Sequence, residues 1–225
     1  MASNNRPGAG PAKRIAILHP DLGIGGAEQL IINVALSLQQ RGYDVTIYTP
    51  FYDPNRCLEE SKQCRVVVKG HWFPASICGR FKAMCAYIRM LLCALWVVLC
   101  AGSFYCYLLD QVSLPIPLLR CRNRNVLFYC HFPDKLLSTN RASIVMRVYR
   151  FFLDYLEELT TAMAHTVLVN SRFTQSIYLQ SFALISKYMP GKVPQILYPA
   201  INPKNFELSQ DAAKPTGIME LLQAG

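Results

Sequence analysis

A short apolar strand, a glycine-rich loop and an amphipathic helix follow one another at the start of the chain, and this order constrains the fold most. Residues 14–20 (RIAILHP) form an apolar run that ends in a turn. Between residues 27 and 38 the apolar positions share one face of a helix, which ends at Arg41-Gly42. Residues 43–49 (YDVTIYT) then predict a second strand. The first 50 residues therefore predict a βαβ unit, whose strands pair in parallel.

The same alternation continues along most of the chain. Helical patterns at 81–101, 142–163 and 172–186 separate further apolar runs of strand length. Those runs lie at 64–69, 104–109, 126–131, 166–170 and 193–198. Strands that alternate with helices form a mostly parallel sheet covered on both faces. We therefore expect one Rossmann-like, doubly wound α/β domain over residues 13–200. A Pro/Gly-rich lead-in at 1–12, expected to be disordered, would precede it, and a short tail at 201–225 would follow.

Composition excludes a disordered chain and gives weak hints about partners. The chain is 52% hydrophobic and 16% charged, which is typical of a globular protein. Its nine cysteines form no Cys-x-x-Cys pair, so we expect reduced, packed thiols in the cytosol, with zinc or disulfides as the alternatives. The net charge of +9 is uneven, because residues 62–150 hold thirteen Lys or Arg against two acids. This excess predicts a face that meets anions, or simply a solvated surface.

Ligands of such sheets bind beyond the carboxyl ends of the strands, where the loop 19–28 (HPDLGIGGAE) lies. A dinucleotide site requires G-x-G-x-x-G/A and an acid at the end of the second strand. Here Glu28 takes the place of the third glycine, and the second strand ends in Thr49-Pro50. A nicotinamide cofactor is therefore disfavoured. An anion at the helix N-terminus, or tight packing of strand and helix, explains the glycines instead.

His131 is the second candidate, because it follows a strand and precedes Phe-Pro-Asp. At the tip of a strand it would contact a substrate hydroxyl or exchange a proton, although a purely structural histidine is the alternative. Its ligand-binding role is favoured because other polar residues end neighbouring strands. These are His19, residues 49–53, Asp110-Gln111, Asp134 and residues 170–172. No spacing of His, Cys and acids suggests a metal, and no G-x-S-x-G elbow suggests a hydrolase.

Residues 90–109 form a run of twenty residues without a charged side chain. As a helix, this run would be long enough to cross a bilayer. A membrane-spanning helix here would divide one sheet between two sides of a membrane, so we do not favour it. We expect a helix at about 83–101 that lies on or in one leaflet and contacts the membrane through Arg89, Leu92 and Trp96. A helix buried in the core is the alternative.

The motifs HPDLGIGGAEQLIINVALSLQQRGYDVTIYT, FYCHFPDKLL, LVNSRFT and LYPAIN together resemble the family 4 retaining glycosyltransferases of GT-B fold. Within that family they are similar to the eukaryotic alpha-1,3/1,6-mannosyltransferases of dolichol-linked oligosaccharide assembly. The resemblance implies transfer of mannose from GDP-mannose to a dolichyl-diphosphate-linked Man-GlcNAc2 core, first by an alpha-1,3 and then by an alpha-1,6 bond. It also implies the cytosolic face of the endoplasmic reticulum membrane, possible sister transferases as partners, and no cofactor or metal. Retention is usually drawn as a same-face displacement, in which the departing phosphate helps to deprotonate the acceptor.

The resemblance assigns roles to a few residues. His131 matches the histidine that contacts the transferred sugar. The glycine loop, with Gly23, Gly25 and Gly26, matches the loop near the donor phosphate and the acceptor. Two aspartates, Asp21 and Asp134, are weaker candidates for contacts with acceptor hydroxyls.

The resemblance ends after Phe206, with Tyr198-Pro199 as the expected hinge. The resemblance implies a further donor-binding domain with an E-x7-E motif that these residues do not include, so we expect the N-terminal, acceptor-side half of a GT-B enzyme, inactive by itself. A non-catalytic membrane-associated scaffold or truncated isoform is the alternative function. A nucleic-acid binder is disfavoured, since no such motif is present.

Overall fold

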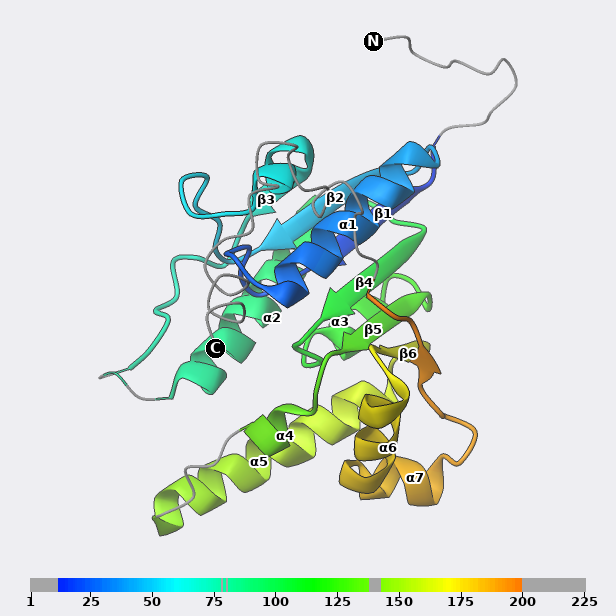
Figure 1. The fold of residues 1–225 in the computed structure, drawn as a ribbon. Coiled ribbons are helices and arrows are strands. Elements are labelled where there is room, and N and C mark those ends of the chain that lie inside the picture. The colour runs from blue at the N-terminus through cyan, green and yellow to red at the C-terminus, as the bar shows by residue number, and fades with distance from the viewer. Residues whose placement is uncertain (1–11, 78, 80, 138–142, 200–225) are drawn as a thin grey trace, which may run out of the picture.

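A computed structural model describes residues 12–77, 79, 81–137 and 143–199, and shows seven strands in one sheet with helices on both faces (Figure 1). The strands are β1 (Arg14–Leu18), β2 (Asp44–Thr49), β3 (Arg65–Val68), β4 (Cys106–Asp110), β5 (Val126–Cys130), β6 (Thr166–Val169) and β7 (Gln195–Ile196). The α-helices are α1 (Gly26–Gln40), α2 (Lys82–Cys100), α3 (Ile116–Arg120), α4 (Asp134–Leu137), α5 (Ile144–Ala162), α6 (Arg172–Ser181) and α7 (Ala183–Tyr188). A 3₁₀ helix, η1, spans Glu59–Gln63.

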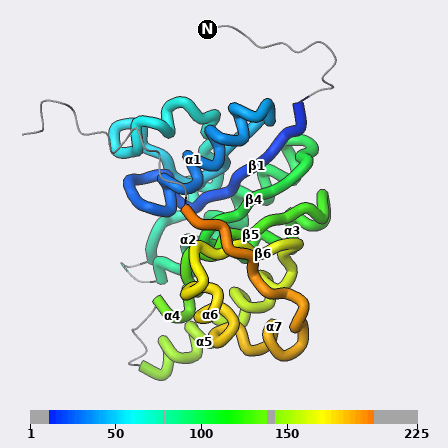
Figure 2. The backbone as a smooth tube through the Cα atoms, turned by 45° about the vertical axis from the view of Figure 1, so that its right-hand side comes forward, coloured from blue at the N-terminus to red at the C-terminus, as the bar shows by residue number. Residues whose placement is uncertain are grey.

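All strand pairs are parallel, and the spatial order is β3-β2-β1-β4-β5-β6-β7. The expected Rossmann-like, doubly wound sheet is thereby confirmed. The chain builds outward from β1 to β3, then returns to place β4 on the other side of β1. Figure 2 shows this reversal in the backbone, where the blue β1 lies beside the green β4. The crevice at such a switch point is where open α/β sheets bind ligands.

The two faces of the sheet hold separate apolar clusters, because successive strand residues point to opposite faces. On one face Ile15 and Ile17 pack with Ile31 of α1. On the other face Ala16 and Leu18 join Met90 of α2 in a larger cluster, to which α3, α5, α6 and α7 also contribute. Helices on both faces explain why the strands are continuously apolar rather than alternating.

Two short helices begin where buried glutamates of α5 accept hydrogen bonds from backbone N–H groups. The Glu157 carboxylate accepts from Asp134 N at 2.7 Å and Lys135 N at 3.0 Å, which starts α4. Glu158 Oε1 accepts from Leu184 N at 2.6 Å, which starts α7. The continuous helix predicted at 172–186 is therefore wrong in one respect, because it breaks at Phe182 into α6 and α7.

Helix α5 carries charged side chains inward and apolar side chains outward. Arg150 is 2% exposed and binds the carboxylates of Asp134 at 3.1 Å and Asp154 at 2.9 Å. The exposed apolar residues are Ile144, Val145, Val148, Phe151, Phe152, Tyr155, Leu156 and Leu159. At 100° per residue all eight fall within an arc of about 140°. Ion pairs and helix caps therefore join α5 to α4 and α7, while Leu153 and Ala162 pack in the apolar cluster on the sheet.

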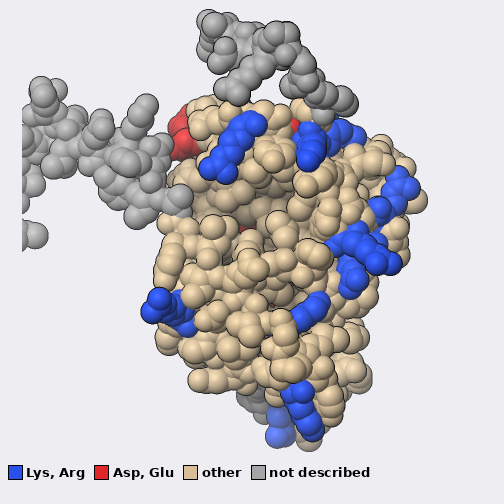
Figure 3. Space-filling model, turned by 90° about the vertical axis from the view of Figure 1, so that its right-hand side faces the viewer, with Lys and Arg blue, Asp and Glu red and all other residues tan. Residues whose placement is uncertain are grey.

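The distribution of surface charge and the state of the cysteines do not indicate a particular partner. Figure 3 shows Lys and Arg side chains in separate groups on one face, with little Asp or Glu, rather than in one continuous patch. Eight of the cysteines lie in the described part of the chain, and these eight are free thiols, as expected. Their expected packing holds only in part, because Cys100 and Cys121 are exposed. The lead-in predicted at 1–12 lies outside the described residues except for residue 12, and the hinge and tail predicted at 201–225 lie entirely outside them.

Candidate active site

Three side chains from the ends of β1, β4 and β5 meet at the switch point of the sheet. Asp110 is fully buried at the end of β4 and lies between two histidines. Its Oδ2 is 2.9 Å from His19 Nδ1, just beyond β1. Its Oδ1 and Oδ2 are 2.9 Å and 3.1 Å from His131 Nε2, just beyond β5. A single buried carboxylate therefore holds both imidazole rings.

Burial and the neighbouring charges shift the pKa values of His19 and Asp110 in opposite directions. Burial alone would lower the pKa of His19, but the Asp110 and Glu28 carboxylates outweigh it and raise that pKa to about 9. Burial alone would raise the pKa of Asp110, but contacts with His131 and His19 bring it below its ordinary value. The contact with His19 also lowers the pKa of Glu28. At neutral pH the structure therefore holds a buried imidazolium next to a buried carboxylate.

The Asp110 contact also fixes His131. Because Nε2 faces the carboxylate, Nε2 is the donor, and Nδ1 makes no hydrogen bond within the described residues. Asn170 Nδ2 donates to the backbone oxygen of His131 at 3.2 Å, and the Tyr129 ring lies 4.7 Å from the imidazole, centroid to centroid. The side chain is 23% exposed, so it is both held and accessible.

His131 forms part of the wall of a cavity of about 420 Å³ at the carboxyl ends of β1, β4 and β5. Its lining residues are Pro20, Ala27, Ala83, Ala86, Tyr87, Gln111, Val112, His131, Phe132, Asp134 and Leu137. Gln111 has a φ of 61°, and Val112 N donates to Asp110 O at 2.7 Å, so the chain reverses within three residues there. A non-glycine residue with positive φ is strained, and such strain is concentrated at functional sites.

The glycine loop runs directly into the N-terminus of α1. Gly25 is extended, with a φ of −173°, and no side chain caps the helix. A Cβ at Gly25 would collide with the Glu28 carboxylate, which lies 3.7 Å from His19 Nε2. A Cβ at Gly26 would meet nothing within 4 Å. Gly25 therefore serves local packing, whereas packing does not require Gly26 to be a glycine.

The other site candidates occupy different surroundings. Asp134 lines the cavity, but Arg150 binds its carboxylate and Tyr87 donates to it at 3.3 Å. Asp21 is an exposed residue. Partial desolvation of its carboxyl group, together with the nearby charge of Glu28, nevertheless raises its pKa. Gly23 is half-buried beside the Asp21 carboxylate. Of the predicted residues, the structure brings His131 and Asp134 to the cavity, and the glycine loop to its edge through Ala27.

Sequence reasoning placed His19 and Asp110 at the strand ends but did not include them in the site. The available signal was the charge of Asp110 at the end of an apolar strand, where an acid without a partner would be costly. The positive φ of Gln111 could not be anticipated, because backbone strain does not show in the sequence. Within the described residues, no group of three or more His, Cys, Asp or Glu side chains is arranged to hold a metal ion.

Helix α2 is long and apolar enough to cross a membrane by length and composition, and 33% of its most apolar window is buried. Leu92 and Trp96 are half-buried, and Arg89 turns inward to donate to Pro50 O at 2.8 Å. The exposed large apolar residues of α2 are Leu91, Leu95 and Leu99. Membrane contact by α2 stays a prediction, and these leucines are the residues placed to make it.

Comparison with known proteins identifies the family. The model of Glycosyltransferase Family 4 matches residues 24–187. Alpha-1,3/1,6-mannosyltransferase ALG2 of Dictyostelium discoideum is 49% identical over 203 residues, covering 88% of this chain and 47% of that protein. ALG2 of Homo sapiens is 42% identical over 220 residues (96% and 51%), and that of Saccharomyces cerevisiae 39% over 201 residues (87% and 39%).

The chain spans about half the length, or less, of these curated relatives. Among solved structures, UGT2 of Phytolacca americana is similar with a TM-score of 0.49 and 11% identity, over 93% of this chain and 57% of that chain. The motifs, the parallel sheet and the family model agree with one another, and the partial coverage fits one Rossmann-like half of a GT-B enzyme. The chain belongs to glycosyltransferase family 4.

Proposed function

We propose that this chain forms the acceptor-side half of a retaining mannosyltransferase. The donor would be GDP-mannose, and the acceptor the dolichyl-diphosphate-linked Man-GlcNAc2 core, elongated by an alpha-1,3 and then an alpha-1,6 mannose. Support comes from three relatives of 39–49% identity, each named alpha-1,3/1,6-mannosyltransferase. The reaction would take place on the cytosolic face of the endoplasmic reticulum membrane, with α2 at the lipid surface.

The observation that carries the proposal is the fixed, accessible imidazole of His131 in the cavity wall. Its Nε2 faces Asp110, so Nδ1 is the atom left to contact a ligand. Such an atom would hydrogen-bond a hydroxyl of the transferred mannose and orient the sugar. Because Asp110 also holds His19, the ring would keep this orientation before the substrate arrives, which reduces the cost of ordering the site.

The N-terminus of α1 supplies the second part of the proposed chemistry. Its first backbone N–H groups have no side-chain cap, and the helix dipole favours an anion at this end. The departing diphosphate of GDP-mannose would bind there, close to Gly26, where the absence of a Cβ leaves room. In a same-face displacement that phosphate accepts the acceptor's proton, so no carboxylate nucleophile is needed in this half.

The test joins this chain to the part of the Dictyostelium relative that the chain does not match, and measures transfer of radiolabelled mannose from GDP-mannose to a lipid-linked acceptor. Transfer by the fusion but not by the chain alone supports an enzyme half. A fusion that is folded and membrane-bound but transfers nothing refutes the proposal and favours a scaffold. Transfer by the chain alone would contradict the assignment of donor binding to the other half.

A further inference from the structure

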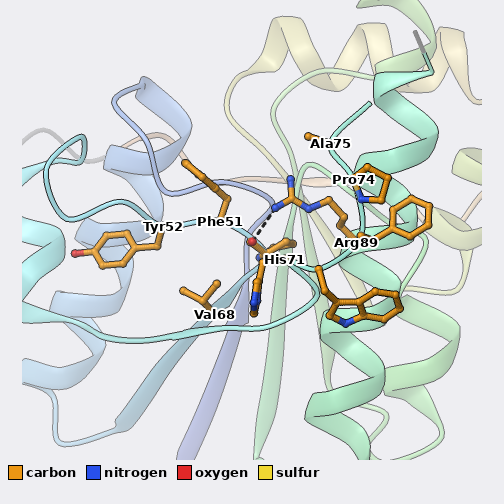
Figure 4. Close-up of a pocket in the computed structure, with 10 residues that line it drawn as sticks. Phe51, Tyr52, Val68, His71, Pro74, Ala75 and Arg89 are labelled. Atoms are coloured by element: carbon orange, nitrogen blue, oxygen red, sulfur yellow. Dashed lines mark hydrogen bonds between the residues drawn. The ribbon is translucent and has the colours of Figure 1, made fainter. Parts of the chain in front are cut away.

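A second cavity, of about 560 Å³, lies at the carboxyl ends of β2 and β3, beside the site described above. Its walls come from the segment after β2, the end of β3 with the loop that follows it, and one residue of α2. The lining residues are Pro50, Phe51, Tyr52, Val68, His71, Trp72, Phe73, Pro74, Ala75 and Arg89 (Figure 4). Neither the motifs nor the proposed transfer reaction uses this cavity.

The walls are aromatic and open to solvent. Trp72 is 70% exposed and Phe51 is 46% exposed, although both are large apolar side chains. The rings of Trp72 and Phe73 meet edge to face with centroids 6.4 Å apart. Flat, exposed rings with a few polar groups are typical of sites that bind ligands with one apolar face.

The cavity is held in shape by its backbone. Gly70 has a φ of 84°, and a Cβ there would collide with the backbone of α2 at Arg89 and Cys93. The loop after β3 therefore packs directly on α2, which only glycine permits. On the opposite wall, the Thr49 hydroxyl donates to Phe51 O at 2.9 Å and so fixes the segment after β2. These contacts position the aromatic rings before any ligand binds.

Arg89 supplies hydrogen-bond donors to this cavity. Its Nη2 donates to Pro50 O at 2.8 Å, drawn as a dashed line in Figure 4, which fixes the guanidinium against the wall. Its Nε is buried without a hydrogen-bond partner, and Nη1 makes no hydrogen bond within the described residues. Because Nε has no exposed surface, a ligand cannot reach it, and Nη1 is the donor of Arg89 that is left for an acceptor in the cavity.

The chemistry favours a neutral sugar ring over an anion. Arg89 is the one Lys or Arg side chain among the described residues that line the cavity, and Asp21 lies near enough to interact with its charge. Lys69, the nearest lysine in sequence, instead rests over the Trp96 ring, 4.6 Å from its centroid. A pyranose offers an apolar C–H face to stack on an indole and hydroxyl or acetamido oxygens to accept from a guanidinium.

We infer that this cavity is a saccharide subsite that binds an N-acetylhexosamine ring by stacking on Trp72 and by hydrogen bonds from Arg89. Ala86, in the wall of the first cavity, and Arg89 are three residues apart on α2, about 4.5 Å along the helix axis. One oligosaccharide can therefore reach both cavities. The choice of the sugar rests on the proposed function, in which the acceptor core contains two such residues.

The chain's two tryptophans make a direct binding test possible. Trp96→Phe leaves Trp72 as the only tryptophan, and N,N′-diacetylchitobiose is titrated into this variant while Trp72 emission is followed. We expect a saturable change with a Kd in the millimolar range. Adding Trp72→Phe should remove the signal, and Arg89→Met should raise Kd at least tenfold with unchanged circular dichroism. Phe173→Ala, which truncates an aromatic residue 66% exposed on α6, should not alter Kd.

Three outcomes would overturn the inference: no saturable change at 50 mM sugar, an unchanged Kd in Arg89→Met, or a response to pyrophosphate but not to the sugar.

Transfer kinetics of the fusion separate this inference from the proposed function. Trp72→Ala should raise the KM for the lipid-linked acceptor at least tenfold with little change in kcat. If the fusion transfers mannose and its acceptor KM is unaffected, the subsite is wrong and the function stands. If sugar binds but no transfer occurs, the function is wrong and the subsite stands.

Discussion

Replacing Asp110 by asparagine should destabilise the fold substantially, because the substitution removes the closer of the two carboxylates that stabilise the buried His19 imidazolium and leaves only Glu28 at 3.7 Å. The pKa of His19 rises from 6.5 to about 9 in the fold, and each pKa unit corresponds to 1.36 kcal/mol, so the stabilisation of the imidazolium is about 3 kcal/mol. Removal of one partner from a buried ion pair costs a similar 3–5 kcal/mol. We therefore expect Asp110→Asn to lower the free energy of unfolding by about 3 kcal/mol at pH 6.5.

The same pair of residues, His19 and Asp110, determines how the free energy of unfolding depends on pH. Because the folded pKa of His19 is raised, its contribution is complete below pH 6.5 and is lost as the pH rises through about 9. Because the folded pKa of Asp110 is lowered, its contribution is present above pH 3.8 and is lost as the pH falls. The free energy of unfolding of the original protein should therefore decline by about 3 kcal/mol from this pair between pH 6.5 and well above 9. Asp110→Asn should remove most of that decline.

Urea denaturation followed by circular dichroism, between pH 5 and 10, measures both effects. Asp44→Asn is the matched control, because its carboxylate pairs with Arg14 at 3.6 Å and both side chains are about 40% exposed. An exposed pair of this kind is worth less than about 1 kcal/mol. If Asp110→Asn costs no more than this control, or if its alkaline decline matches that of the original protein, the reasoning about the buried pair is refuted.

Four further substitutions separate packing from function. Gly25→Ala should displace the Glu28 carboxylate and lower the melting temperature. Gly26→Ala should leave the melting temperature equal or higher but reduce transfer by the fusion, because a Cβ would intrude on the diphosphate. Full transfer by Gly26→Ala would contradict the assignment of diphosphate binding to this loop. Gln111→Gly should stabilise by up to about 1 kcal/mol by relieving the positive φ, and no gain in urea denaturation would show that the turn is unstrained. Gly70→Ala should cost more than about 2 kcal/mol, because its Cβ meets fixed backbone, and a smaller loss would contradict the direct packing of this loop on α2.

The fold could be predicted from the sequence because its signals are local. Seven apolar runs of strand length, separated by helical patterns, predict the parallel sheet, and each run coincides with one of β1 to β7, with Asp110 of β4 lying one residue beyond its run. The break at Phe182 and the short α4 could not be predicted. Both depend on hydrogen bonds that glutamates of α5 accept from backbone N–H groups 23 and 26 positions away along the chain.

The candidate site could be predicted only in part, for a similar reason. His131 and the glycine loop stand out in the sequence because of their place after a strand. The bridging role of Asp110 depends on the order of the strands, which puts β4 between β1 and β5. The inward turn of Arg89 was unexpected, because a cation beside an apolar helix more often faces a membrane surface or water.

The most direct test of the central claim, that His131 orients the transferred sugar, is the rate of mannose transfer by the fusion protein carrying His131→Ala. His165→Ala is the control, since His165 is exposed at the opposite end of the sheet, just before β6. Loss of one positioned hydrogen bond in an active site lowers kcat by about 10²-fold or more. We predict such a loss for His131→Ala under conditions in which circular dichroism shows the variant to be folded, with full activity in His165→Ala. Equal transfer by the His131→Ala variant and the original fusion would contradict the account.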